Sequence, residues 1–123
     1  MDIFISSTSG RPIYEQIEDQ IKNKILTGQL KAEEALPSIR LLAKELRISV
    51  ITTKRAYEEL ERAGFIVTVA GKGSFVAPRN PQIMREEHLR RIENHLSEAL
   101  GEARIGGFSK EEVVELLELL FEE

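Results

Sequence analysis

Residues 46–76, LRISVITTKRAYEELERAGFIVTVAGKGSFV, contain the pattern that decides the fold. Ser49 is a typical N-cap residue, so a helix is expected to begin directly after it. Ala56, Tyr57 and Leu60 recur at the spacing of a single helix face and are expected to lie inward. Gly64 favours the end of this helix near Ala63. The first half of the stretch therefore predicts one amphipathic helix.

The second half predicts a β-hairpin. Residues 65–69, FIVTV, are β-branched and aromatic, which is typical of a strand. AGKG at 70–73 is a glycine-rich turn, and residues 74–77 form the expected return strand. Pro78 and Pro81 are expected to close this unit.

Upstream, the spacing predicts two more helices. Ser38 can cap a helix over residues 39–46, which a three-residue break separates from the next helix. A longer helix is expected from Pro12 to about Thr27, because four isoleucines from Ile13 to Ile25 recur every four residues. Two short helices joined by a tight turn and followed by a hairpin form a winged helix-turn-helix.

The last part of the chain predicts two further helices. Leu89, Ile92, Leu96, Ala99 and Ala103 follow a 3-4-3-4 spacing, which is a heptad-like seam. After Gly106 and Gly107, Ser109 and Glu112 have the spacing of a capping box for a helix over about 110–121. The expected fold class is α+β and mostly helical. It comprises an N-terminal winged helix-turn-helix domain (1–79) and a two-helix C-terminal dimerisation segment (80–123).

Composition excludes several function classes. The 123 residues include no cysteine, which excludes disulfides, thiolate zinc sites and cysteine nucleophiles. No apolar run approaches about 18 residues and the N-terminus does not resemble a secretory signal, so we expect a cytoplasmic protein without a membrane span. No catalytic set, metal site or cofactor is predicted. His88 and His95 lie about 10 Å apart on one helix face, too far to share a metal. GKGS lies between strands, which argues against a phosphate loop.

Charge is distributed unevenly along the chain. The net charge is −4, yet residues 36–78 hold seven basic and four acidic side chains, whereas residues 81–123 hold five basic and eleven acidic ones. The middle of the chain can therefore face phosphates and the tail cannot. A third helix that begins with Ser49, Thr52, Thr53 and Lys54 offers hydroxyls and an ammonium at its positive end. The spacing alone leaves DNA binding and plain core architecture equally open.

The stretch LPSIRLLAKELRISVITTKRAYEELERAGFIVTVAGKGSFV resembles the DNA-binding domain of GntR-family transcription regulators, and RPIYEQIEDQIKNKILTGQL resembles the first helix of that domain. The resemblance runs from about Arg11 to Arg79 and implies a sequence-specific transcription regulator rather than an enzyme. Where many relatives carry an arginine after the serine, this chain has Val50, which can only contact a thymine methyl or fill space. Thr53 replaces a usually aliphatic residue and is either a contact or merely tolerated. The expected DNA-contacting residues are Ser38, Arg40, Ser49, Val50, Thr52, Thr53, Lys54, Gly71 and Lys72.

The short tail resembles that of the small YtrA-type members of this family. The resemblance implies a homodimer, often a repressor of a small operon that includes transporter genes, on a pseudo-palindromic operator in double-stranded DNA. Unpaired apolar surface on two helices also favours pairing with a second copy. The expected dimerisation residues are Leu89, Ile92, Leu96, Leu116, Leu117, Leu120 and Phe121.

Four alternatives stay open. The tail can instead fold back onto the winged domain. The winged helix can bind a protein rather than DNA, or bind DNA without sequence preference, which the charge of −4 fits poorly. A small-molecule effector, expected between tail and winged domain, is compatible with the sequence, but no residue identifies its site.

Overall fold

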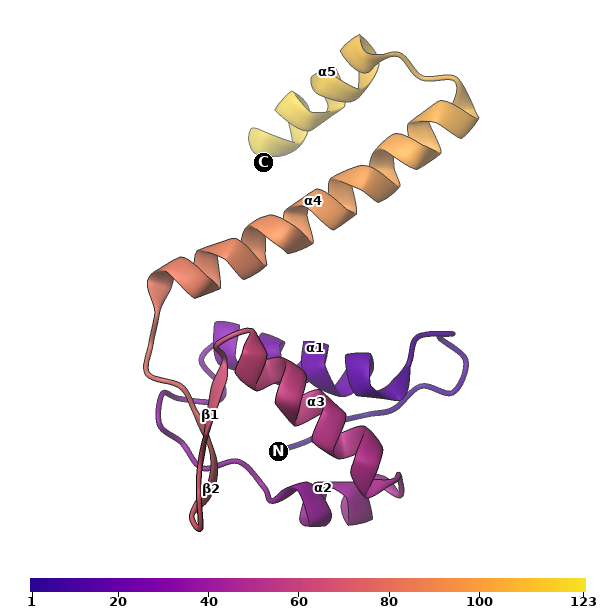
Figure 1. The fold of residues 1–123 in the computed structure, drawn as a ribbon. Coiled ribbons are helices and arrows are strands. Elements are labelled where there is room, and N and C mark those ends of the chain that lie inside the picture. The colour runs from indigo at the N-terminus through magenta and orange to yellow at the C-terminus, as the bar shows by residue number, and fades with distance from the viewer. The chain divides into compact units, whose positions relative to one another are not determined.

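The computed structural model describes all 123 residues and divides into two compact units, Met1–Met84 and Arg85–Glu123. The chain runs through α1 (Ile13–Leu26), α2 (Ile39–Leu46), α3 (Val50–Arg62), β1 (Ile66–Val69), β2 (Gly73–Val76), α4 (Pro81–Gly106) and α5 (Lys110–Phe121) (Figure 1). The mostly helical α+β winged helix-turn-helix class is confirmed. No helix combines the length and the apolar character that crossing a membrane requires.

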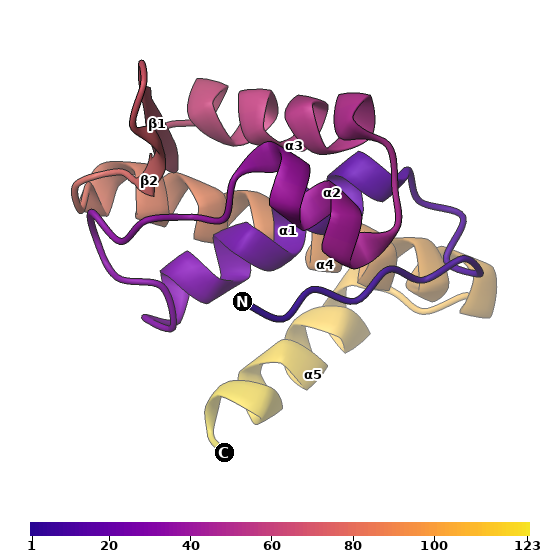
Figure 2. The same cartoon turned by 90° about the horizontal axis from the view of Figure 1, so that it is seen from below.

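The first unit is organised around α3, which packs against α1, α2 and β1 (Figure 2). Its core contains side chains with almost no exposed surface: Ile17, Ile21, Leu42, Ala56, Leu60, Ile66 and Val76. The predicted inward face of α3 is confirmed by this burial. The isoleucine stripe of α1 is confirmed only in its middle, because Ile13 at its beginning is 37% exposed.

Several element boundaries differ slightly from those the sequence predicts. Pro12 is the N-cap of α1, with an extended ψ of 143°, and helical geometry begins at Ile13. Pro81 does not close the winged domain but is the first residue of α4. Asn80 explains this start, because its side-chain oxygen accepts the backbone N–H groups of Gln82 and Ile83.

Two glutamine side chains hold the segment that precedes α1. Gln20 accepts the Phe4 N–H at 2.9 Å and donates to the Phe4 carbonyl at 2.7 Å, as a neighbouring strand would. Gln16 accepts the Ser6 N–H at 2.8 Å and donates to the Ser6 carbonyl at 3.0 Å. Ile3 is thereby held in the core. Residues that precede the first helix are therefore part of the packed unit.

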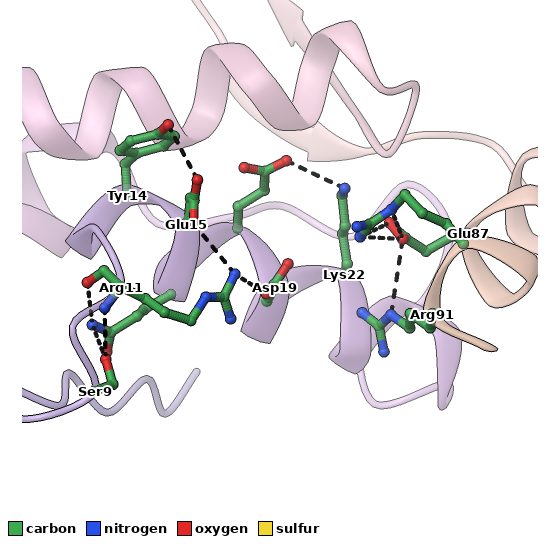
Figure 3. A network of polar contacts seen from close by, with 11 residues as sticks. Ser9, Arg11, Tyr14, Glu15, Asp19, Lys22, Glu87 and Arg91 are labelled. Carbon is green, nitrogen blue, oxygen red and sulfur yellow. Dashed lines mark hydrogen bonds and ion pairs between the residues drawn. The ribbon is translucent and has the colours of Figure 1, made fainter. Parts of the chain in front are cut away.

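An ion-pair cluster fixes the beginning of α1 (Figure 3). The guanidinium of Arg11 lies 2.6 Å from a carboxylate oxygen of Asp19 and 3.5 Å from one of Glu15. Because both carboxylates follow Arg11 on the same side of the helix, the cluster closes the loop onto its first turns. The guanidinium of Arg11 is thus paired with carboxylates of its own chain.

Candidate nucleic-acid interface

The turn between α2 and α3 is fixed by backbone hydrogen bonds and not by glycine. Arg47 adopts the left-handed conformation (φ 57°, ψ 46°), and its N–H donates to the carbonyl of Lys44. The N–H of Ile48 donates to the carbonyl of Ala43, which completes a Schellman motif. An arginine at this position carries the steric cost that glycine avoids. The motif sets α3 in a defined direction directly after α2.

Ser49 organises the first turn of α3. Its side-chain oxygen accepts the Thr52 N–H at 3.0 Å, and its hydroxyl donates to Thr52 Oγ1 at 2.8 Å. This confirms Ser49 as the N-cap. Because Ser49 uses its own hydroxyl hydrogen within the protein, the hydroxyl hydrogen of Thr52 is left to donate outward. Thr52, rather than Ser49, is therefore the residue expected to donate a hydrogen bond to DNA at the start of α3.

Thr53 lies in the core and not on the surface. Its side chain has no exposed area, and its hydroxyl donates to the carbonyl of Ser49 at 3.1 Å. Thr53 therefore satisfies its hydroxyl within the helix, as threonine can at the fourth residue after an acceptor. Of the two readings the sequence left open, the structure favours a tolerated core residue, and we remove Thr53 from the set of DNA contacts.

The outer face of the α3 start carries two aliphatic side chains and one ammonium. Val50 is 47% exposed and Ile51 is 81% exposed, while Lys54 lies one turn further along on the surface. Sequence reasoning selected Val50 and Lys54 but missed Ile51. The helical period contained the signal, because Ile51 lies about 200° around the helix axis from the buried Thr53.

The two helices are also tied together on the core side. The hydroxyl of Tyr57, on α3, donates to the carbonyl of Pro37 at 2.8 Å, one residue before the N-cap of α2. Burial raises the pKa of Tyr57 well above its usual range, and Glu45 adds to this shift. Ser38 caps α2 by accepting the Leu41 N–H, and Arg40 in the first turn of α2 has an exposed side chain. The Tyr57–Pro37 hydrogen bond and the Ser38 cap therefore fix the first turn of α2, which carries Arg40.

The hairpin of β1 and β2, which we call the wing, has a tip built for a tight turn. Val69 pairs with Gly73, and the Lys72 N–H donates to the Val69 carbonyl at 2.9 Å. Gly71 and Gly73 have φ angles of 76° and 107°, which L side chains rarely adopt, although added Cβ atoms would meet no neighbour. The two glycines are thus needed for the backbone conformation, and Lys72 extends from the tip.

The wing is attached to the rest of the winged domain up to the Thr68–Ser74 pair, one pair before its tip. Ala35 forms an antiparallel bridge with Phe75, and the Leu36 N–H donates to the Ser74 carbonyl at 2.9 Å. On the other side, a carboxylate oxygen of Glu61 on α3 accepts the Thr68 N–H at 3.0 Å. The connector before α2 and the body of α3 therefore hold the wing from both edges.

The structure divides the basic side chains of residues 36–78 into two groups. Arg62 is bonded to Glu59, which raises its pKa, and Arg55 lies 3.9 Å over the ring of Tyr14. The other five have exposed side chains and no carboxylate within ion-pair distance: Arg40, Lys44, Arg47, Lys54 and Lys72. Three of these five were selected from the sequence, and Lys44 and Arg47 were not. These unpaired cations are the ones that can neutralise phosphates.

The second unit presents the predicted dimerisation residues on its surface. All seven are more than two-fifths exposed: Leu89, Ile92, Leu96, Leu116, Leu117, Leu120 and Phe121. The capping box of Ser109 and Glu112 is confirmed at the start of α5, yet no residue of α5 is buried. An open groove of about 600 Å³ separates α4 from α5 and is lined mostly by apolar side chains, among them Ala99, Ala103, Phe108, Val113, Leu116 and Leu119.

Comparison with known proteins agrees with this architecture. The family described as "Bacterial regulatory proteins, gntR family" matches residues 13–76. The HTH-type transcriptional repressor YtrA of Bacillus subtilis (strain 168) is 34% identical over 113 residues, which span 92% of this chain and 87% of that protein.

Solved structures give the same result. A transcriptional regulator from Oenococcus oeni superposes with a TM-score of 0.77 at 31% identity, covering 95% of this chain and 97% of that chain. The DNA-binding domain of AraR, crystallised in complex with operator ORE1, superposes with a TM-score of 0.53 at 26% identity. That match covers 63% of this chain and 94% of the AraR domain.

Proposed function

Because this chain belongs to the GntR family of bacterial regulatory proteins and is a DNA-binding transcription regulator, we propose that it acts as a homodimeric repressor. The family and the relatives are transcription regulators and not enzymes. The proposed target is a pseudo-palindromic operator of a small operon, with transporter genes as candidates. Such a regulator works in the cytoplasm, where operator DNA lies. The observation that carries the proposal is the group of five unpaired cations around the α2–α3 turn and the wing.

In this proposal the start of α3 enters the major groove. Val50 and Ile51 are exposed there, and aliphatic side chains contact the methyl group of thymine. The hydroxyl of Thr52 and the ammonium of Lys54 supply polar contacts to base edges or phosphates. The operator is therefore expected to contain thymine opposite the first turn of α3. This preference differs from that of an arginine at position 50, which would read guanine.

Arg40 and Lys72 are proposed to hold the protein on the duplex from two sides. Arg40 lies in the first turn of α2, and Lys72 lies at the wing tip. Both side chains are exposed and unpaired, so contacting a phosphate requires no ion pair to be broken. The narrow Gly71–Gly73 tip also allows an approach to the minor groove.

The homodimer is proposed to form through α4 and α5. An isolated 12-residue helix is marginal in water, and α5 buries none of its own residues. Full burial of a leucine side chain is worth roughly 1.5–3 kcal/mol, so a tail leucine that is about half exposed contributes about 0.8–1.5 kcal/mol when a partner covers it. A second copy brings the same apolar surface and fits the open groove, so we propose that each α5 covers its partner's tail. Two recognition helices would then meet half-sites separated by about 10 base pairs or a multiple of this.

Fluorescence anisotropy on the purified protein tests the proposal. The probe is a labelled duplex from upstream of the protein's own gene, and the control is a shuffled duplex of the same composition. We expect salt-sensitive binding that is about 10³-fold tighter for the operator than for the control. Equal, weak binding to both duplexes would contradict sequence-specific regulation at this site. No binding at low salt would favour a protein ligand for the winged helix.

Light scattering on the same sample tests the oligomeric state. A homodimer of the 14.0 kDa chain is expected to give about twice the monomer mass at the concentrations used for DNA binding. A monomer that still binds the operator selectively would contradict dimerisation through the tail. It would support the alternative in which the tail folds back on the winged domain.

A further inference from the structure

A small cavity lies at the base of the wing, within the first unit. Its volume is about 180 Å³, and its wall combines the end of α1, the connector that follows, the feet of both strands and residues 77–84. Ile25, Leu30, Phe65 and Val76 provide an apolar floor, and three of these four are buried core residues. The cavity belongs neither to the α3 surface nor to the wing tip, so the proposed DNA contacts do not account for it.

The volume of the cavity limits the size of a ligand that it can hold. A protein cavity of about 150 Å³ lined by aliphatic and aromatic side chains binds benzene. A cavity of about 180 Å³ with a similar floor therefore accommodates a six-membered ring or a short branched chain. Larger ligands would have to extend beyond the mouth.

The charged residues around the cavity indicate the charge of a ligand that would bind there. Lys31 and Arg79 are the only ionisable residues in its wall, and both side chains are exposed without a carboxylate at ion-pair distance. Glu34, three residues after Lys31, accepts the backbone N–H of Lys31 with a carboxylate oxygen at 3.0 Å and forms no ion pair with its ammonium. Two cations at the edge of an apolar cavity are complementary to an anion attached to an apolar body.

We propose that this cavity is the binding site for a small organic carboxylate. The apolar part of the ligand occupies the floor formed by Leu30, Phe65 and Val76, and its carboxylate pairs with Lys31 and Arg79 at the mouth. The binding itself is independent of the proposed repressor function. Only its consequence for DNA rests on that function.

The consequence follows from the composition of the wall. Residues 77–80 form the linker between β2 and α4. This linker contributes Arg79 and Asn80 to the cavity, and the first turn of α4 contributes Ile83 and Met84. Ile83 already packs on Gly64, where an added Cβ would lie 2.6 Å from its Cδ1 atom. A ligand that contacts both the foot of the wing and this linker favours one path of the linker over others. The linker leads into α4, so the ligand would shift the population of dimers whose recognition helices have the operator spacing.

Benzoate is a suitable probe because it joins a six-membered ring to a carboxylate, and benzamide is its neutral isostere. Amide resonances of the isotope-labelled full chain are followed by two-dimensional NMR during titration with each compound. We expect benzoate to bind with a Kd on the order of 1 mM and to shift the amides of Leu30, Phe65 and Ala77. Benzamide is expected to bind about tenfold more weakly or not at all, since it lacks the charge.

The variant Lys31→Gln with Arg79→Gln removes both cations from exposed positions and is expected to weaken benzoate binding about tenfold or more. As a control, Lys110→Gln removes one exposed cation from α5, away from the cavity, and should leave the titration unchanged. Equal binding of benzoate and benzamide would overturn the proposal. So would unchanged benzoate binding by the double variant, or the absence of saturable shifts at these amides up to about 20 mM.

Operator binding is measured on the same samples by anisotropy. If the proposed function is wrong, the operator titration fails while the benzoate titration at the cavity remains readable. If the cavity proposal is wrong, the operator titration succeeds and the benzoate result fails. The two proposals can therefore fail independently.

Discussion

Replacement of Lys72 by alanine isolates one phosphate contact from the rest of the protein. The turn at the wing tip depends on the φ angles of Gly71 and Gly73 and on the backbone bond from residue 72 to Val69. The Lys72 side chain is exposed and pairs with no carboxylate. Lys72→Ala therefore keeps the backbone donor and removes only the ammonium, so the thermal midpoint of unfolding should not change.

The expected effect can be worked out from counterion release. Each phosphate neutralised on B-DNA contributes about −0.9 to the slope of log K against log salt concentration. A homodimer carries two wings, so Lys72→Ala is expected to reduce the steepness of the slope by about 1.8. Between about 50 and 200 mM salt the parent then loses about twelvefold more affinity than the variant does.

Anisotropy titrations with the operator duplex at three or four salt concentrations measure this slope directly. Lys110→Ala is the matched control, because it removes the same charge from an exposed position on α5. A slope for Lys72→Ala that equals those of the parent and the control would refute the phosphate contact. A lower affinity at every salt concentration with an unchanged slope would indicate that Lys72 acts through shape and not through charge.

Three further predictions concern the α2 support, the core and the tail. Arg40→Ala is expected to weaken binding to all duplexes and to reduce the steepness of the salt slope by about 1.8 in the dimer, without lowering the unfolding midpoint; anisotropy and thermal melts check this, and parental affinity would show that the assignment of Arg40 is wrong. Tyr57 has a raised pKa, so above about pH 10 the unfolded chain releases a proton that the folded chain keeps. The free energy of unfolding should then fall by up to about 1.4 kcal/mol per pH unit, and Tyr57→Phe should lack this component in urea titrations between about pH 9 and 11. Leu116→Glu combined with Leu120→Glu is expected to yield monomers by light scattering, whereas Ile105→Glu, at an exposed position outside the predicted set, should remain dimeric.

Local signals predicted most of the helices and strands correctly. Ser38, Ser49 and Ser109 each cap the helix that the sequence assigned to them, because a cap is satisfied by atoms only three residues away. The inner face of α3 follows from the helical period alone. Pro81 was misjudged, since the same residue is typical both of a turn and of a first helical position.

The parts of the site that depend on distant partners were not predictable. The burial of Thr53 depends on how α3 packs in the core, and the sequence shows only that threonine is polar. The bonds from Gln16 and Gln20 to the N-terminal segment join residues that are 10 and 16 positions apart without any periodic pattern. The separation of unpaired cations from paired ones required side-chain positions: Arg55 and Lys54 are neighbours in sequence, yet only Arg55 lies over an aromatic ring.

The wing is fixed along most of its length, and only the turn beyond the Thr68–Ser74 pair lacks an attachment to the rest of the domain. The Val76 N–H donates to the carbonyl of Glu34, and the Leu36 N–H donates to that of Ser74. The amide hydrogens of Val76 and Leu36 should exchange with solvent only when the winged domain opens as a whole, while those near Gly71 should exchange through small local movements. The free end can therefore follow a groove whose width varies along the duplex. Because the attached part of the wing ends at the Thr68–Ser74 pair, we expect such an adjustment to leave the orientation of α3 unchanged.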